Sequence, residues 1–393
     1  MKTQTEGNQI IAFPDENITS NNALAVEQEL CQIAASEPDK ELVIDASLIE
    51  YVSSAGLRIF LGLTNSIEGK LTIRNVSPSL YEIFDITGFT ELLNVEKKMR
   101  VLSVDGCEVI GQGAFGTVYR LDEDTIIKVY PSKESLPMIK RERELSRQAF
   151  IRGVPTAISF DIVKVGDGYG SVFELLKANL MNDVLKENPE KIDDLVKDFV
   201  NLMRSIHNVE VEPGELPSAS KKYLKCLDDL SDVIPEDVSS GMRKLLEDIP
   251  EDNHVVHGVF HMKNIMISDG QPLVIDLETV CCGDPIFDLQ GLYVTYVAYL
   301  EAEEDNSVKF LGIPATISRS VFEKSVDYYF EDLSEEEREQ CLNRIKLLGN
   351  LRFLECVVLN GSTSPDLKDV RIKQAVTHMR ELLPKVDHLW VRR

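Results

Sequence analysis

The sequence predicts an α/β domain followed by a larger α+β part with two lobes. Short strands alternate with helices over residues 1–98, which indicates a small α/β layer. A β-rich pattern starts at Val101, and helices dominate from about residue 177 to Arg393. At 393 residues the chain is long enough for two or three domains. We therefore expect domains over residues 1–98 and 101–393, the second with an N-lobe of about 101–176 and a C-lobe of about 177–393.

The elements expected in the first domain follow from its apolar pattern. Short apolar runs bounded by polar residues predict strands, and apolar residues at helical spacing predict helices. The strands are Gln9–Phe13, Glu41–Asp45 and Lys70–Arg74, and the helices are Asn22–Ala34, Ser54–Asn65 and Ser77–Phe84. A charged segment, Glu96–Arg100, is expected to be the hinge before the second domain.

The second domain begins with strands around a glycine-rich loop. The expected strands are Glu108–Ile110, Thr117–Arg120, Thr125–Tyr130 and Gly170–Leu176, with a helix at Met138–Ile151. Helices follow, interrupted by short strands that hold a polar segment near residues 257–278.

Composition and charge narrow the function classes. The apolar fraction of 43% fits ordinary globular domains. A net charge of −24 argues against nucleic acid as a partner, because phosphates demand a basic face. The negative charge either forms a solvated surface that only increases solubility or favours the binding of a cationic or neutral ligand. We expect a cytoplasmic protein with no membrane span, since no long apolar stretch or signal peptide is visible and the seven cysteines suit reduced thiols.

The glycine-rich loop suits a nucleotide. Gly111, Gly113 and Gly116 lie between two β-type runs, so the loop joins antiparallel strands and is not the strand-to-helix turn of a dinucleotide site. Phe115 at the tip suits a lid over phosphates, and Val118 suits a wall against an adenine ring. A GxGxxG pattern alone is weak evidence, because glycine clusters also form ordinary turns.

Lys128 places a lone cation in an apolar strand. A buried lysine needs an anionic partner, and nucleotide phosphates together with a helix carboxylate would supply one. The helix carboxylate is Glu144 or Glu142, and Glu144 is preferred because it lies just ahead of the helix stretch that ends at Gly153-Val154-Pro155.

Asn264 and Asp276 are the candidate metal ligands. Hard cations such as Mg²⁺ take oxygen ligands, with ATP phosphates and water completing the shell. Asp276 ends an apolar run, where a strand terminus would present its carboxylate. Glu278, two residues on, points to the same side and is a possible helper.

Residues 101–393 resemble the aminoglycoside phosphotransferase and choline kinase-like family. The shared motifs are the glycine loop, Lys128, Ser205-Ile206-His207, His257-Gly258 with Asn264, Ile275-Asp276, and Gly283-Asp284-Pro285-Ile286-Phe287-Asp288-Leu289. The resemblance implies a two-lobed protein kinase-like fold, ATP with magnesium between the lobes, and a small-molecule hydroxyl as acceptor. It also implies that Asp288 supports the catalytic loop.

Val259 is the main departure from this family. The family has an aspartate there, which accepts or orients the proton of the acceptor hydroxyl. General base catalysis contributes ~10²–10⁴ in rate, so three interpretations stay open. In the first, the domain binds nucleotide without catalysis. In the second, phosphoryl transfer proceeds slowly by positioning and metal electrostatics. In the third, His261 replaces the aspartate as the base. His254 and His257 are expected to be structural.

Residues 41–95 resemble the STAS domain of anti-sigma factor antagonists. The shared motifs are Leu42-Val43-Ile44-Asp45, Tyr51-Val52-Ser53-Ser54-Ala55-Gly56-Leu57-Arg58 and Ile86-Thr87-Gly88-Phe89. In that family a serine at a helix start is phosphorylated by a partner kinase. Ser54 is the best candidate by position and Ser53 the second, although the family's aspartate before the serine is absent. The alternative is that the serine only caps the helix.

Two functions are therefore carried forward. The first is an ATP- and magnesium-dependent phosphotransferase acting on a hydroxyl of a small molecule or protein, coupled to a STAS regulatory domain. The second is a nucleotide-binding pseudokinase that signals through the STAS surface to an anti-sigma factor-like partner.

Overall fold

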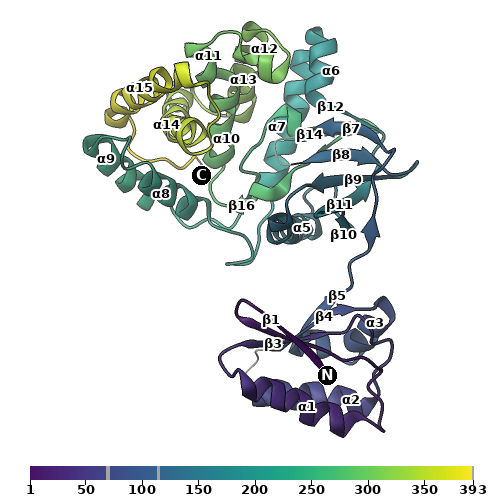
Figure 1. The fold of residues 1–393 in the computed structure, drawn as a ribbon. Helices are drawn as coiled ribbons and strands as arrows, with labels where there is room; N and C mark the ends of the chain where they lie inside the picture. The colour runs from purple at the N-terminus through teal and green to yellow at the C-terminus, as the bar shows by residue number, and fades with distance from the viewer. Residues whose placement is uncertain (68–70, 113–115, 392–393) are drawn as a thin grey trace. The chain divides into compact units, whose positions relative to one another are not determined.

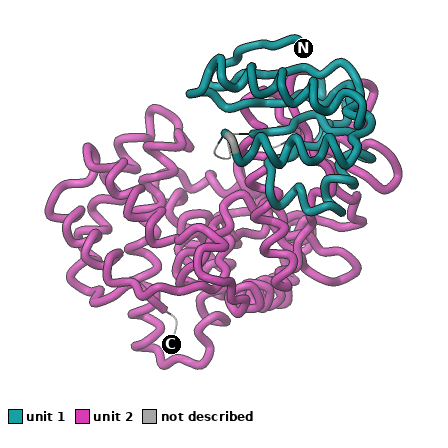
Figure 2. The backbone as a smooth tube through the Cα atoms, turned by 90° about the horizontal axis from the view of Figure 1, so that it is seen from below, with its two compact units in different colours: residues 1–103, 163–166 teal, residues 104–162, 167–393 magenta. Residues whose placement is uncertain are grey.

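The chain forms two compact units, which are described separately here. In this computed structural model, residues 1–67, 71–112 and 116–391 are described. One unit is Met1–Ser103 with Val163–Gly166, and the other is Val104–Ile162 with Asp167–Arg393 (Figure 2). No helix in the described part of the chain is long and apolar enough to cross a membrane.

The first unit is built on a five-stranded sheet of order β1-β2-β3-β4-β5. β1 pairs antiparallel with β2, whereas the remaining neighbours are parallel. The strands are β1 (Lys2–Glu6), β2 (Gln9–Phe13), β3 (Glu41–Asp45), β4 (Leu71–Val76) and β5 (Asn94–Lys97); the helices are α1 (Ala23–Ser36), α2 (Ser54–Ser66), α3 (Pro78–Ile86) and α4 (Phe89–Leu92). Helices α1 and α2 lie side by side along the sheet (Figure 1).

The predicted α/β layer is confirmed, with two edge strands added. The sequence pattern did not predict β1, whose residues are all exposed, because an exposed edge strand needs no apolar run. It also did not predict β5, so the expected charged hinge begins inside a strand. The core of this unit combines the inner strands with one face each of α1, α2 and α3, for example Ile44, Phe60 and Phe84.

The N-lobe is a mainly antiparallel sheet with one long helix, and it belongs to the second unit except for residues 101–102 and 163–165, which are grouped with the first. The strands run in the order β6-β10-β11-β9-β8-β7. Their bounds are β6 (Val101–Leu102), β7 (Glu108–Gln112), β8 (Thr117–Arg120), β9 (Thr125–Tyr130), β10 (Asp161–Val165) and β11 (Gly168–Glu174), and the helix is α5 (Leu136–Ile151). The short β6 is parallel to residues 164–165 of β10. Pro137 occupies the first turn of α5, where its missing N–H costs no hydrogen bond.

The C-lobe is mainly helical, as the sequence predicts. Its helices are α6 (Met181–Glu187), α7 (Ile192–His207), α8 (Ala219–Asp229), α9 (Glu236–Glu247), α10 (Ile286–Tyr293), α11 (Tyr299–Ala302), α12 (Asn306–Leu311), α13 (Ala315–Tyr329), α14 (Glu335–Leu354) and α15 (Pro365–Leu382). Two π-helical segments are present in the described chain, η5 (Val294–Ala298) between α10 and α11, and η6 (Glu355–Leu359) after α14. The long α14 starts at a capping box formed by Ser334 and Glu337.

Short strands carry the polar segment of the C-lobe. A three-stranded sheet has the order β12 (Ala178–Leu180), β14 (Ile265–Ser268) and β15 (Gln271–Val274), and β13 (Val255–Val256) pairs with β16 (Cys281–Cys282). The core of the second unit includes Leu145 and Ala149 in the C-terminal half of α5 and residues from the long helices of the C-lobe. Cys281 and Cys282 are buried in it, and all seven cysteines are free thiols.

Candidate nucleotide site

The glycine-rich loop connects β7 and β8 as an antiparallel hairpin. Gly111 pairs with Val118, and Val118 in turn pairs with Lys128 on β9. A Cβ atom added to Gly116 would lie 2.5 Å from the carbonyl oxygen of Val129, so only glycine fits this close approach of two backbones. Gly113 and Phe115, which were predicted to cover phosphates, lie outside the described residues.

Lys128 joins the N-lobe to the C-lobe through two carboxylates. Its Nζ lies 3.5 Å from Glu142 Oε1 and 3.3 Å from Asp276 Oδ1. Burial disfavours the charged ammonium, but the carboxylates of Glu142 and Asp276 outweigh it and hold the pKa of Lys128 above its usual range. The strand lysine is thus a fully charged cation at the place where the two lobes meet.

The helix carboxylate is Glu142 and not the preferred Glu144. Helix α5 buries Ile139, Glu142, Leu145 and Ala149, a spacing of three to four residues. Glu144 follows Glu142 by two residues, which turns it about 200° around the helix. It is exposed and bonds to Arg147 and Gln148. Glu142 is 7% exposed and also accepts a hydrogen bond of 2.8 Å from the Tyr130 hydroxyl. The helical spacing that begins at Ile139 was the signal that favoured Glu142.

The polar loop over residues 257–264 is anchored at its start by Asp288. This carboxylate is fully buried and accepts hydrogen bonds from the backbone N–H groups of His257 (2.8 Å) and Gly258 (2.6 Å). His207 Nε2 lies 2.9 Å from the same carboxylate, and His207 Nδ1 lies 2.8 Å from the Tyr329 hydroxyl. Burial would raise the pKa of Asp288, but the His207 hydrogen bond and the nearby His257 hold it below its usual range. Three elements, α7, α10 and α13, therefore fix the start of the loop.

Asn264 and Asp276 lie at the same end of the β14–β15 hairpin. The backbone N–H of Ile275 donates to the carbonyl of Asn264 at 2.9 Å, which brings the two flanking positions together. The Asn264 Nδ2 donates to the Val259 carbonyl at 3.0 Å, so the amide oxygen is the atom left to face a cation. Asp276 has φ of +66°, a left-handed conformation that is uncommon for a residue other than glycine and that places its carboxylate toward Lys128.

The Asn264 amide oxygen and the Asp276 carboxylate suit magnesium better than a metal ion that is coordinated by protein ligands alone. Within the described ranges, no three His, Cys, Asp or Glu side chains gather as a ligand set. Mg²⁺ is usually held by one or two protein oxygens together with nucleotide phosphates and water. Glu278 is half-buried, and burial and the neighbouring Asp276 raise the pKa of its carboxyl. The donor set therefore fits a cation that arrives with a nucleotide.

Val259 and His261 leave the loop without a strong base. The side chain of Val259 cannot accept a proton, and it stands where the resemblance given in the sequence analysis implies an aspartate. His261 is 8% exposed, its Nδ1 has no hydrogen-bond partner among the described residues, and burial with the nearby His257 lowers its pKa to about 4. A group with this pKa is a poor match for a base at neutral pH. The geometry does not compensate for the missing carboxylate.

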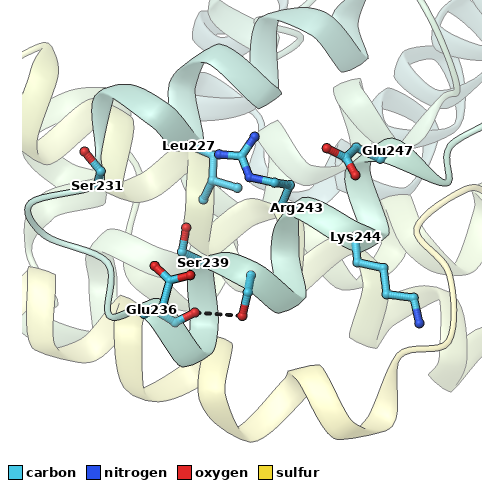
Figure 3. A pocket seen from close by; sticks show the side chains of 8 residues that line it. Leu227, Ser231, Glu236, Ser239, Arg243, Lys244 and Glu247 are labelled. Atoms are coloured by element: carbon cyan, nitrogen blue, oxygen red, sulfur yellow. Dashed lines mark hydrogen bonds between the residues drawn. The ribbon is translucent and has the colours of Figure 1, made fainter.

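A depression of about 330 Å³ lies elsewhere in the C-lobe, along α8 and α9 (Figure 3). It is open and mainly polar, with Glu236, Ser239, Arg243 and Lys244 among its lining residues. None of the predicted site residues lines it, and Arg243 is already paired with Asp228. This depression is not part of the nucleotide site.

The two candidate serines of the first unit have different environments. Ser53 is the N-cap of α2, where its hydroxyl accepts a hydrogen bond of 3.3 Å from the Gly56 N–H, and it is 8% exposed. Ser54 is the first residue of the helix and is exposed. A Cβ atom on Gly56 would lie 2.7 Å from Val52 and 2.8 Å from Ile18, which explains glycine in this motif. The capping role therefore falls to Ser53, and the accessible hydroxyl belongs to Ser54.

Each of the two units matches a known protein family. A model of the phosphotransferase enzyme family matches residues 106–309, and a STAS domain model matches residues 1–101. BtrV of Bordetella bronchiseptica, named as a candidate anti-sigma factor antagonist, is 31% identical over 89 residues, which are 22% of this chain and 76% of BtrV.

Solved structures that are similar to this chain include the following two. A mutant of the aminoglycoside phosphotransferase APH(4)-Ia with ADP and hygromycin B is 14% identical with a TM-score of 0.48, over 71% of this chain and 93% of that one. A choline/ethanolamine kinase family protein from Mesorhizobium loti is 17% identical with a TM-score of 0.44, over 70% and 87% of the respective chains. The family-model matches and the similarity to BtrV show that this chain belongs to the phosphotransferase enzyme family and carries an N-terminal STAS domain of the anti-sigma factor antagonist kind.

Proposed function

We propose that the second unit binds ATP with magnesium and slowly transfers the terminal phosphoryl group to a hydroxyl. The supporting observation is the position of Lys128, whose ammonium lies within 3.5 Å of Glu142 on one lobe and within 3.3 Å of Asp276 on the other. In kinase-like enzymes a strand lysine held by a helix carboxylate contacts the nucleotide phosphates. Lys128 and Glu142 have this relationship.

Asn264 and Asp276 are the proposed magnesium ligands. The amide oxygen of Asn264 is oriented by the hydrogen bond that the amide nitrogen Nδ2 donates to the Val259 carbonyl, and the Asp276 side chain is 39% exposed. When bound, magnesium neutralises negative charge on the phosphates and fixes their geometry. The backbone conformation of Asp276 and the hairpin hydrogen bonds keep both oxygens in place before any ligand arrives.

Phosphoryl transfer would depend more on the positioning of ATP and the acceptor hydroxyl than on removal of the hydroxyl proton by a base. The acceptor hydroxyl oxygen forms a bond to the γ-phosphorus, the bond between that phosphorus and the β,γ-bridging oxygen breaks, and ADP leaves. The hydroxyl proton passes to solvent or to a phosphate oxygen, because Val259 accepts none. Positioning and electrostatic stabilisation supply most of the catalysis of phosphoryl transfer, so a slow reaction is retained.

Thermal unfolding with ATP and magnesium tests the nucleotide site. At about 100 times its Kd, a ligand stabilises the folded protein by about 2.7 kcal/mol, so a clear rise in Tm is expected. Asp276→Asn removes the charge but keeps a residue that tolerates left-handed backbone, and it should abolish most of this rise. Asp269→Asn is the matched control, since Asp269 has φ of +49° in the exposed turn of the same hairpin. Absence of any rise in the unmodified protein would contradict nucleotide binding.

A second function is favoured by Val259 itself. Without a carboxylate at this position, the unit would bind nucleotide and act through its conformation, as a pseudokinase. Both functions predict the rise in Tm with ATP and magnesium. Only the enzyme would release ADP in the presence of an acceptor and transfer labelled phosphate to it.

We also propose that the STAS domain docks a partner protein of the anti-sigma factor kind, under the control of phosphorylation at Ser54. The exposed hydroxyl at the start of α2 supports this site, and a phosphate there would add about two negative charges to the docking surface. Mass spectrometry of the protein isolated from its own cells should find phosphate on Ser54 and none on the capping Ser53. Phosphate on Ser53 alone, or on neither serine under any growth condition, would count against the proposal.

A further inference from the structure

Tyr130 is a fully buried tyrosine two residues after Lys128 on β9. Alternate residues of a strand point to the same side of the sheet, so the side chains of Lys128 and Tyr130 share a face. The Lys128 ammonium lies over the Tyr130 ring, 5.2 Å from its centroid, which is within the roughly 6 Å of a cation–π contact. Because the exposed fraction of Tyr130 is 0%, its hydroxyl needs a partner inside the protein.

The partner of the Tyr130 hydroxyl is Glu142. The hydroxyl donates a hydrogen bond of 2.8 Å to Glu142 Oε2. The other carboxylate oxygen, Oε1, lies 3.5 Å from Lys128 Nζ, a distance longer than the roughly 3.2 Å of a well-formed N–H···O hydrogen bond. Among the residues that the structure describes, Tyr130 is the hydrogen-bond donor to this carboxylate. Tyr130 therefore sets the orientation of the Glu142 carboxylate, whereas the attraction between Glu142 and Lys128 is longer and less directional.

The Glu142 carboxylate depends on this hydrogen bond because it is buried. Only 7% of the residue is exposed, so water cannot freely replace a donor that is lost. Burial and the negative charge of Glu142 raise the pKa of Tyr130, which keeps the proton on the hydroxyl and preserves it as a donor. Without the hydroxyl, Oε2 would have to turn toward another donor, and this rotation would move Oε1 away from Lys128.

The Tyr130 ring also reaches the end of the glycine-rich loop. A Cβ atom added to Gly116 would lie 3.7 Å from Tyr130 Cδ1, an ordinary van der Waals distance. Tyr130 thus lies next to three parts of the candidate nucleotide site, which are the glycine loop, the strand lysine and the helix glutamate. A single buried side chain therefore connects the hairpin of β7 and β8, strand β9 and helix α5.

Glu142 matters most for Lys128 when the site is occupied. The Lys128 ammonium now lies between two carboxylates, at 3.5 Å from Glu142 and 3.3 Å from Asp276. Asp276 is a proposed magnesium ligand, and a carboxylate that binds a cation attracts a neighbouring ammonium less strongly. Glu142 is then the partner that keeps Lys128 in place, so the orientation of Glu142 determines where the ammonium meets the phosphates.

We propose that Tyr130 is a positioning residue of the nucleotide site: its hydroxyl orients Glu142, which in turn holds Lys128 in place to contact the phosphates of ATP. The proposal rests on the proposed function, because it concerns the same site. It holds for an enzyme and for a pseudokinase alike, since it concerns nucleotide binding and no step of phosphoryl transfer. Tyr130 itself does not touch the nucleotide, so its effect is confined to the phosphates that Lys128 contacts.

Calorimetric titration of the full chain with ATP and magnesium, and separately with adenosine, tests this role. Tyr130→Phe keeps the buried ring and removes only the hydroxyl. It should weaken the binding of ATP by about tenfold, the effect of losing one hydrogen bond to a charged group. Adenosine has no phosphate for Lys128 to contact, so its affinity should stay unchanged. A tyrosine that only stabilises the N-lobe would change both affinities alike or neither.

Tyr328→Phe is the matched control. The Tyr328 hydroxyl donates at 3.1 Å to Asp193 Oδ1, and Lys324 Nζ lies 2.7 Å from the same oxygen. The same three kinds of side chain therefore meet at the surface of α7 and α13, away from the residues assigned to the nucleotide. Loss of the Tyr328 hydroxyl should leave the affinities of ATP and adenosine unchanged.

Glu142→Gln shows whether Tyr130 acts through the glutamate. This variant keeps the shape of the side chain but removes the charge beside Lys128, so it should weaken ATP binding by itself. In the double variant, Tyr130→Phe should cause no further loss, because residues that act as a unit do not contribute additively. An unchanged ATP affinity of Tyr130→Phe, a parallel loss of adenosine binding, or additive losses in the double variant would each overturn the positioning role and leave the proposed function intact. Absence of ATP binding by the unmodified protein would instead contradict the proposed function, and this proposal with it.

Discussion

Replacement of Val259 by aspartate should raise the rate of phosphoryl transfer by about 10²–10⁴-fold, the usual contribution of a general base. This range corresponds to about 3–5 kcal/mol of transition-state stabilisation. The backbone at this position is already held, because its carbonyl accepts a hydrogen bond from Asn264 at 3.0 Å and its N–H donates to His257 Nδ1 at 3.3 Å. Aspartate is no larger than valine, so the exchange supplies the carboxylate without displacing the loop.

The measurement is ADP release and labelled phosphate transfer in the presence of a hydroxyl acceptor. Val259→Asn is the control, because it has the same shape as aspartate but cannot remove a proton. It should stay near the rate of the unmodified protein. An aspartate variant that still binds ATP but transfers no faster would show that the acceptor is not positioned for in-line attack, and the pseudokinase function would then be preferred.

Asp288→Ala should be the most destabilising single substitution near the site. It leaves the backbone N–H groups of His257 and Gly258 and the ring of His207 without their common buried acceptor. Loss of one partner of a buried charged pair typically costs about 3–5 kcal/mol. Because the pKa of Asp288 is lowered in the folded state, its contribution is present above the pKa of an unfolded aspartate and is lost as the pH falls toward the folded value.

Urea denaturation followed by tryptophan fluorescence can measure this effect, since the single Trp390 lies in the second unit. Asp332→Ala is a suitable control, because Asp332 is exposed and its loss should change the free energy of unfolding by no more than about 0.5 kcal/mol. A cost for Asp288→Ala as small as that of the control would mean that the loop is held by other contacts.

Prediction from sequence succeeded where the signal was local. The glycine loop between two β runs, the apolar strand of Lys128 and the apolar run before Asp276 each follow from a short pattern, and the structure has a hairpin, a strand and a strand end at these places. The alternation of strands and helices likewise predicted the α/β layer of the first unit. Local patterns are informative because backbone conformation depends mainly on neighbouring residues.

Prediction failed where side-chain direction mattered. Glu142 and Glu144 both belong to a charged helix, and the choice between them depends on which face of α5 packs inward. For the two serines the motif named Ser54 first, and the structure adds that Ser53 caps the helix whereas Ser54 is exposed. A sequence pattern places the ends of a helix only to within one or two residues. It therefore cannot assign a single residue to the buried or the exposed face of that helix.

The sequence by itself determined the family, the order of the two units and the residue types available for a nucleotide and a metal. Only the tertiary structure decided which of these residues meet. Lys128 and Asp276 are 148 positions apart, and no local pattern states that their side chains come within 3.3 Å. Contacts between distant segments arise from the packing of whole helices and strands, whose buried faces are chosen together when the chain folds.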